Sequence, residues 1–505
     1  MSKRFDVLVV GGGINGVGIA RDAVGRGLSV CLCEADDLAS HTSSASTKLI
    51  HGGLRYLEQY EFRLVGKALA EREVLLRIAP HIIWPLRFVL PHQSHLRPAW
   101  MIRIGMFLYD HLGGKRTLEG SRKVDLRSDA VGAPLKDALT TGFAYSDGWV
   151  QDARLVVLNA MDAAQRGADI RTRTRCVQAQ RVEDHWVATL ESRDGQRSTI
   201  QAGAVVNAAG PWAVDFLDEA AMLKHGHSLR LVKGSHIVVP KMFEHDAAYI
   251  FQQPDRRIVF AIPYERDYTL VGTTDMEYHG DPACPQIDAD EVRYLCEAAN
   301  RYFRQAITPE DVVWTYSGVR PLLEDDEDNA SEVTRDYQLE LDARGAPLLS
   351  VFGGKLTTYR KLAEEAMDKL VSRMGRKAPA WTAQGAPLPG GDMPGGFDAM
   401  LAQLRRSHAW LPDAMAWRLA RNYGTRVTQI LGDAASRADL GQHFGADLYQ
   451  AEVDYLRAHE YVCEAEDLLW RRSKLGLRLT PAEQARLATY VEAVVTAPPQ
   501  RVAAH

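Results

Sequence analysis

The chain has 505 residues, of which 46% are hydrophobic and 25% are charged, a composition that is typical of folded globular proteins and excludes a disordered or fibrous chain. Lysine and arginine total 60 against 65 acidic residues, and the net charge of −5 argues against a nucleic-acid-binding protein. A chain of this length is expected to form about two to four domains.

The six cysteines are scattered, without the paired CxxC spacing of structural zinc sites, so we expect reduced thiols, a cytosolic compartment and no metal. Cys31 and Cys33 are expected to pack on one face of a strand. The N-terminus leads directly into an apolar run and glycines, so we expect no signal peptide. No stretch approaches about 18 uncharged apolar residues, which predicts that any membrane contact is peripheral.

The first 34 residues predict one βαβ unit. Its parts are a strand at 5–10, a glycine turn at 11–16, a helix at 17–26 and a strand at 28–34. Apolar residues then recur near helical spacing from Leu57 to Ile78, and this predicts a helix that closes before Pro80.

Short β-rich segments between about 230 and 320 predict an antiparallel sheet inserted into the nucleotide-binding domain. These segments are 235–239, 257–262 and 269–272. Residues 375–396 contain four prolines and six glycines, which marks a domain boundary, and amphipathic helices are expected at 397–495.

The glycine turn matches G-x-G-x-x-G at Gly11, Gly13 and Gly16, between a strand and a helix. Glycines there let the backbone approach a pyrophosphate at the helix N-terminus. Glu34 follows the second strand, where a carboxylate accepts hydrogen bonds from ribose hydroxyls. This context predicts a dinucleotide site without distinguishing FAD from NAD. No second fingerprint is present, which disfavours an enzyme that uses both.

The small-residue turn at Ala209 and Gly210, which follows a predicted strand, is suited to approach the same dinucleotide; an ordinary strand end explains it equally well.

A dense motif at 43–56 combines hydroxyls, glycines and reactive side chains. Its hydroxyls are suited to line a cofactor phosphate or a flavin edge, and it supplies a base, a fork-shaped cation and a phenol; the alternative is a solvated loop with a helix cap. The hydroxyl residues are Ser43, Ser44 and Thr47, and the reactive side chains are His51, Arg55 and Tyr56.

Two further motifs carry cations. Arg320 lies in YSGVRP, and Lys355 lies in SVFGGKLTTY, a strand followed by a Gly-Gly turn and a helix start. A helix N-terminus at this turn would stabilise negative charge on a reduced flavin. The turn contributes Gly353, Gly354, Lys355, Leu356 and Thr357 to the expected cofactor site. A surface ion pair for Arg320 and a solvated helix residue for Lys355 remain open alternatives.

Together these motifs resemble the FAD-linked glycerol-3-phosphate dehydrogenase family, most closely its aerobic bacterial members. The resemblance runs from GGGINGVGIARDA through SSASTKLIHGGLRYLE, LRPAWMIRIG, NAAGPWA, SGVRPL and VFGGKLTTYRKLAE to LLWRRSKLG, and so covers nearly the whole chain. Trp470 in the last string departs conservatively from the phenylalanine that we expect there.

The resemblance implies an α/β fold of the D-amino-acid-oxidase type: a Rossmann-like FAD-binding domain, an inserted antiparallel-sheet substrate domain and an all-helical C-terminal domain. The expected FAD-binding parts are 1–80, 145–230 and 330–375, the substrate and cap parts are 81–144 and 231–329, the linker is 376–396, and the helical domain is 397–505. It also implies oxidation of sn-glycerol 3-phosphate to dihydroxyacetone phosphate, with electron transfer to ubiquinone. It further implies a homodimer that binds peripherally to inner-membrane lipid at the cytoplasmic face.

Carried over by motif, the catalytic candidates are His51, Lys355 and Tyr56, and the substrate-binding candidates are Arg55, Arg320 and Thr358. We expect the two arginines to hold the phosphate, because a guanidinium matches two of its oxygens. We favour His51 as the base, because an imidazole pKa near about 6.5 suits neutral pH better than that of a lysine.

Three rival functions remain open. They are a glycerophosphate oxidase that uses dioxygen, a related flavoenzyme of amino or 2-hydroxy acids, and a flavin-binding regulatory or structural protein without turnover. In the segment Trp100–Tyr109 and just after it, Met101, Ile104, Leu108 and Leu112 share an apolar helical face, with Arg103, Lys115 and Arg116 nearby. Its pattern fits an interfacial anchor or a buried core helix, and on the sequence alone we favour the core helix.

Overall fold

The protein is described from a computed structural model, in which residues 3–57, 60–93, 97–114, 117–226, 228–255, 257–323 and 337–495 are placed. The chain divides into two compact units. The first comprises Met1–Ile78 and Ile83–Ala386, and the second comprises Ala79–Ile82 and Pro387–His505. The division after Ala386 falls inside the segment rich in proline and glycine.

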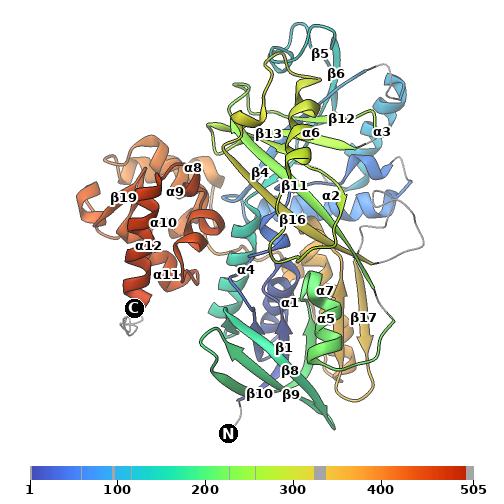
Figure 1. The fold of residues 1–505 in the computed structure, drawn as a ribbon, viewed down its shortest axis with the longest axis vertical. Helices are drawn as coiled ribbons and strands as arrows, with labels where there is room; N and C mark the ends of the chain where they lie inside the picture. Colours follow the sequence, from blue (N-terminus) through green and yellow to red (C-terminus); the bar gives the residue numbers. More distant parts are fainter. Residues whose placement is uncertain are drawn as a thin grey trace. The chain divides into compact units, whose positions relative to one another are not determined.

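A mostly parallel sheet organises one half of the first unit (Figure 1). Its strands run in the order β17-β18-β10-β1-β2-β7, with β9 beside β10 and β8 beside β9. Their bounds are β1 Lys3–Val10, β2 Val30–Cys33, β7 Asp169–Arg171, β8 Thr174–Val182, β9 His185–Ser192, β10 Arg197–Asn207, β17 Gln338–Asp342 and β18 Leu348–Phe352. Since β1, β10 and β18 are parallel neighbours, the turns that follow them meet at one edge of the sheet.

Three helices accompany this sheet, with α1 packed against both α4 and α7. They are α1 Ile14–Gly25, α4 Asp152–Gln165 and α7 Tyr359–Arg373; the short α5 covers Ala213–Asp215. The predicted βαβ unit is present, but α1 begins at Ile14, inside the glycine motif, rather than at Val17. Cys31 and Cys33 are buried in β2 and belong to one core cluster, which confirms the packing prediction.

The second sheet is antiparallel except where β12 pairs with β4, and it runs β15-β11-β14-β13-β12-β4-β6-β3, with β16 beside β11 and β5 beside β6. Its bounds are β3 Leu49–Ile50, β4 Ile83–Pro91, β5 Arg122–Asp125, β6 Thr141–Val150, β11 Leu229–Pro240, β12 Ala248–Gln252, β13 Ile258–Tyr264, β14 Tyr268–Gly272, β15 Met276–Glu277 and β16 Trp314–Leu323. Helix α6, Ala289–Asn300, packs on it. The fold class is confirmed, although the strands between 49 and 150 were not part of the predicted sheet.

Two helices, α2 and α3, lie between strands of the second sheet in the sequence. Helix α2 spans Phe62–Ile78 and so begins later than the predicted Leu57, because residues 54–57 form a separate 3-10 turn. Helix α3 spans Ala99–Leu112, and its predicted burial in the core is wrong for one face. That face exposes Trp100 by 63%, Ile104 by 53%, Phe107 by 61% and Leu108 by 36%, and we call these four residues the outer face of α3. Lys115 and Arg116 lie outside the described residues.

The second unit is built from helices around its own apolar core. They are α8 Gly396–Ser407, α9 Asp413–Tyr423, α10 Val427–Leu431, α11 Gln450–His459 and α12 Pro481–Val495. The helical prediction omitted one feature, a short hairpin of β19 (His443–Gly445) and β20 (Leu448–Tyr449). Trp470 packs against the core of this unit. Within the placed part of the chain, no helix has the length and apolarity needed to span a bilayer.

Candidate active site

The glycine turn after β1 is too crowded for side chains. A Cβ on Gly11 would lie 2.4 Å from the carbonyl oxygen of Ala208, and one on Gly16 would lie 1.9 Å from the carbonyl oxygen of Gly11. Gly11 also has a φ of +111°, which favours glycine. Gly13 is the N-cap of α1, so the N–H groups of the first helical turn, which have no acceptor within the helix, lie at the same place. This cradle fits a dinucleotide pyrophosphate.

Glu34 and Ser43 flank the cradle. The Glu34 carboxylate accepts hydrogen bonds from the N–H groups of Gly12 at 2.5 Å and Asp36 at 2.9 Å. Burial raises the pKa of Glu34. The Ser43 hydroxyl accepts a hydrogen bond from the N–H of Ile14 at 3.0 Å, so this serine lies at the start of α1, beside the cradle.

The small-residue turn after β10 also reaches the cradle. The N–H of Ala208 donates to the carbonyl of Val10 at 2.9 Å, which places Ala209 and Gly210 beside the glycine turn. Gly210 has a φ of +58°. The Ser44 hydroxyl, by contrast, donates to the carbonyl of His41 at 3.2 Å within its own turn.

A buried ion pair anchors the loop that carries the second motif. The Lys48 ammonium lies 2.8 Å from a carboxylate oxygen of Asp152, and both side chains are almost fully buried. The Ser46 hydroxyl donates to the same carboxylate at 2.7 Å. The Thr47 hydroxyl is directed elsewhere, 3.0 Å from Nε2 of His236 on β11. Thr47 therefore connects this loop to the antiparallel sheet.

His236 is a buried imidazole that the sequence did not single out. Its ring stacks on Tyr316 with centroids 4.7 Å apart. Burial, together with the nearby cations Lys48 and Arg320, holds the pKa of His236 well below its usual range. The ring is therefore neutral at physiological pH.

The HGGLRY and GGKLTT segments, some 300 residues apart in the sequence, meet in space. The N–H of His51 donates to the Thr357 hydroxyl at 3.2 Å. The Lys355 ammonium lies 3.9 Å from the centroid of the Tyr56 ring, a cation–π contact. Three of the proposed reactive residues thus lie on two contacting segments.

The same Gly-Gly turn also contacts the start of α1. The side-chain amide of Asn15 donates to the carbonyl of Gly353 at 3.1 Å. Gly353 and Gly354 have φ values of +68° and +102°, which explains the glycine pair. Leu356–Thr358 then form a single turn before α7. The turn after β18 therefore lies beside the dinucleotide cradle, where the sequence reasoning expected it.

Arg320 on β16 is only partly exposed and is paired. Its guanidinium forms an ion pair with Asp275 and donates to the Thr273 hydroxyl at 3.2 Å. The strand itself is fixed to the cofactor loop, because the Thr42 hydroxyl donates to the carbonyl of Val319 at 2.7 Å. Arg320 therefore does form an ion pair, which was the alternative interpretation from the sequence. The pair is within the chain and lies beside the candidate site.

Two other substrate candidates are less informative. Thr358 is buried, and its N–H donates to the carbonyl of Lys355 at 3.1 Å. The side chain of Arg55 lies outside the described residues.

Sequence reasoning missed His236, Asp275 and Asp152, which contact Thr47, Arg320 and Lys48 respectively. Each stands alone in its segment, and a single histidine or aspartate in a strand or helix start carries no pattern. The only local signal was that a buried lysine or arginine needs a carboxylate partner somewhere.

The comparisons with known proteins agree with this geometry. A model of the FAD dependent oxidoreductase family matches residues 6–360. The chain is 56% identical to a glycerol-3-phosphate dehydrogenase of Pseudomonas aeruginosa, over 97% of this chain and 96% of that protein. The chain belongs to the FAD-dependent glycerol-3-phosphate dehydrogenase family. It is also 51% identical to the aerobic glycerol-3-phosphate dehydrogenase of Escherichia coli, over 96% of this chain and 97% of that protein.

Further comparisons find a relative named for another sugar-alcohol phosphate and a structure solved with FAD. It is 50% identical to the D-erythritol 1-phosphate dehydrogenase of Brucella abortus, over 97% of this chain and 98% of that protein. A glycerol-3-phosphate dehydrogenase of Bacillus halodurans, solved with FAD, has a TM-score of 0.77 at 29% identity, over 98% of this chain and 95% of that chain. Residues 351–496 match the C-terminal domain of alpha-glycerophosphate oxidase. The cofactor is FAD, which the glycine cradle and Glu34 fit.

Proposed function

We propose that this flavoenzyme oxidises sn-glycerol 3-phosphate to dihydroxyacetone phosphate and passes the electrons to a membrane quinone. The observation that carries the proposal is the meeting of the His51–Tyr56 segment with the Lys355 turn, beside the FAD cradle. The names of the relatives at 50–56% identity support a phosphorylated polyol as the substrate.

Oxidation of the secondary alcohol requires removal of the hydroxyl proton and of a hydride from C2. Bound FAD supplies the hydride acceptor and can return electrons singly to a quinone. We assign His51 as the base that takes the hydroxyl proton, because imidazole has an ordinary pKa of about 6.5. In this proposal the Lys355 ammonium polarises the substrate oxygen and Tyr56 orients the substrate.

The phosphate is assigned to Arg55 and Arg320. A guanidinium carries five N–H donors, and Arg320 uses part of this set on Asp275 and Thr273. Asp275 keeps the side chain oriented, and a guanidinium held in this way can bind a phosphate through its paired N–H donors. Thr358 is assigned to the same pocket.

The first experiment is anaerobic addition of sn-glycerol 3-phosphate to the purified holoenzyme while the visible flavin absorbance is followed. Bleaching, with recovery on addition of a soluble quinone, supports both the substrate and the acceptor. D-erythritol 1-phosphate is the matched comparison, because a relative at 50% identity is named for it. Bleaching by D-erythritol 1-phosphate alone would contradict the assigned substrate, and bleaching only by amino or 2-hydroxy acids would contradict the substrate class.

An oxidase that uses dioxygen is the second candidate, because residues 351–496 match a domain named for alpha-glycerophosphate oxidase. Peroxide production in aerated buffer, compared with reduction of a quinone analogue, separates the two acceptors. Peroxide release at the full rate of turnover would contradict the quinone assignment.

We also propose that the protein acts as a homodimer bound peripherally to inner-membrane lipid at the cytoplasmic face. Lipid contact is assigned to the outer face of α3, since large exposed apolar side chains on one helix are characteristic of interfacial helices. Arg103, exposed on the same helix, would favour anionic headgroups. Light scattering of the purified protein tests the dimer.

A further inference from the structure

A buried polar network lies directly under the loop that carries His51. The Tyr109 hydroxyl accepts a hydrogen bond from the N–H of Gly52 at 2.8 Å. It also lies 2.9 and 2.8 Å from the two carboxylate oxygens of Asp147, to which it donates. Tyr109 and Asp147 are each only 2% exposed, so these contacts are shielded from water.

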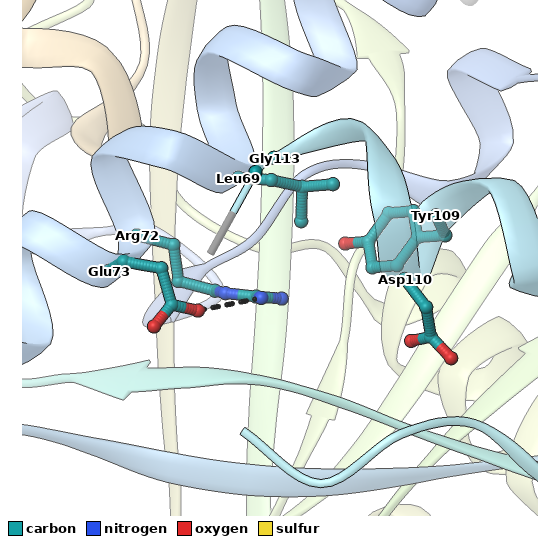
Figure 2. Close-up of a pocket in the computed structure, with 7 residues that line it drawn as sticks. Leu69, Arg72, Glu73, Tyr109, Asp110 and Gly113 are labelled. Carbon is teal, nitrogen blue, oxygen red and sulfur yellow. Dashed lines mark hydrogen bonds and ion pairs between the residues drawn. The ribbon is translucent and has the colours of Figure 1, made fainter. Parts of the chain in front are cut away.

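Arg72 completes this network from a third element. Its guanidinium donates to the Asp147 carboxylate at 2.8 Å and to the carbonyl of Ser146 at 2.9 Å. A further nitrogen donates to Glu73 at 3.0 Å. In Figure 2 the Tyr109 hydroxyl and the Arg72 guanidinium point toward each other across a small cavity that Leu69 also lines. Helices α2 and α3 and strand β6 therefore converge on one backbone N–H.

This contact leaves no room for a side chain at Gly52. A Cβ at this position would lie 2.9 Å from the Tyr109 hydroxyl and 2.7 Å from a methyl carbon of Leu69. The neighbouring residue on one side, His51, is held through its own N–H by Thr357. Two successive N–H groups of the loop are thus held by different elements. The N–H of His51 donates to Thr357, which follows β18 of the first sheet, and the N–H of Gly52 donates to Tyr109 on α3.

We propose that Tyr109, supported by Asp147 and Arg72, is a positioning residue that sets the backbone of the His51–Tyr56 loop for catalysis. This proposal rests on the proposed function in one respect: the loop must carry groups that meet the substrate. Tyr109 itself touches neither substrate nor cofactor in this proposal. It acts through Gly52, which is adjacent to His51.

The network is more than an anchor for buried polar groups, because its end point is a loop rather than a helix or strand. Arg72, Asp147 and Tyr109 could satisfy one another without Gly52. The N–H of Gly52, however, donates to this hydroxyl and also lies beside the Asp147 carboxylate that the hydroxyl orients. A displacement of about 1 Å at a catalytic group can lower the rate about a hundredfold. A defect here should therefore appear in the chemical step.

The test is Tyr109→Phe in the full-length holoenzyme, which removes one hydroxyl and keeps the ring. The matched control is Tyr302→Phe, because Tyr302 is equally buried and its hydroxyl donates to the carbonyl of Gln252 at 2.6 Å, far along the chain from this loop. For both variants, kcat, KM, the anaerobic rate of flavin bleaching, flavin content and melting temperature are measured with sn-glycerol 3-phosphate.

We expect Tyr109→Phe to lower kcat and the bleaching rate by about ten- to a hundredfold, with KM changed less than about threefold and flavin content unchanged. Tyr302→Phe should leave kcat at the wild-type value. Asp147→Asn, which keeps an acceptor for Tyr109 but removes the charge, should lower kcat by less than Tyr109→Phe does.

Four results are distinguishable. A wild-type kcat in Tyr109→Phe would overturn the proposal, and so would an equal loss of kcat in Tyr302→Phe. If Tyr109→Phe is poorly folded, the bleaching rate per bound flavin in Asp147→Asn decides, and a wild-type rate there overturns it. A wild-type enzyme that does not bleach with this substrate would instead refute the proposed function.

Discussion

The outer face of α3 gives the most direct test of membrane contact. Replacing Ile104 and Phe107 together with serine removes two apolar side chains that are 53% and 61% exposed. Complete burial of such a side chain is worth about 1.5–3 kcal/mol. Burying the exposed half of each in lipid is therefore worth roughly 1–1.5 kcal/mol, and the pair about 2–3 kcal/mol.

This free energy corresponds to a loss of roughly 30- to 150-fold in the partition coefficient of the double variant, since about 1.4 kcal/mol is tenfold. The assay is sedimentation with vesicles of zwitterionic and anionic phospholipid, at several lipid concentrations. Val313→Ser is the control, because Val313 is 52% exposed and lies outside α3. Vesicle binding by the double variant at the wild-type level would refute the reasoning, as would an equal loss in the control.

Three further predictions concern the cofactor, the substrate and the buried network. Gly16→Ala should abolish flavin binding, because the added Cβ would lie 1.9 Å from the carbonyl oxygen of Gly11. The visible absorbance of the purified protein measures the bound flavin. The control is Gly105→Ala, whose Cβ would meet no atom within 4 Å and which should bind flavin normally. Arg320→Lys should raise KM about ten- to a hundredfold more than it lowers kcat in steady-state assays, because an ammonium cannot replace the guanidinium fork. Burial raises the pKa of Asp147 from 3.8 to about 6, so the native state binds this proton more tightly than the unfolded state. The contribution of Asp147 to the free energy of unfolding should then fall by an amount on the order of 3 kcal/mol as pH rises from about 4 to 6. Urea titrations measure it as the difference between the wild type and Asp147→Asn at each pH.

The parts of the fold that the sequence predicted are those whose signal is local. Gly11, Gly13 and Gly16 belong to one short turn, and the requirement for glycine arises within that turn and its immediate neighbours. The same holds for the Gly353–Gly354 pair, whose positive φ values require glycine. Local patterns therefore located the cradle and the turn beside it.

What the sequence could not predict depends on partners far along the chain. Arg320 on β16 was recognised as a cation, but its partner Asp275 lies 45 residues earlier, in the segment between β14 and β15. Thr47 was assigned to the cofactor because hydroxyls surround it, whereas its hydroxyl contacts His236, 189 residues later. Pairings of this kind are decided by sheet topology, and a single sequence carries no record of them.

Helix α3 shows a related limit. Its periodicity correctly grouped Ile104 and Leu108 on one face, because residues four apart lie together on a helix. Periodicity does not say whether an apolar face meets protein or another apolar medium, so the preference for a core helix was wrong. The deciding fact is the exposed fraction of these side chains, which only the tertiary structure supplies.

The two faces of α3 make the membrane and positioning proposals separable. Tyr109 and Met106 are buried, while Ile104 and Phe107 are exposed, so substitution on one face leaves the other intact. The Ile104→Ser and Phe107→Ser double variant should lose vesicle binding yet keep its kcat with a soluble dye acceptor. Tyr109→Phe should keep vesicle binding and lose kcat. A loss of both properties in both variants would mean that α3 has simply unfolded, and neither assignment would then stand.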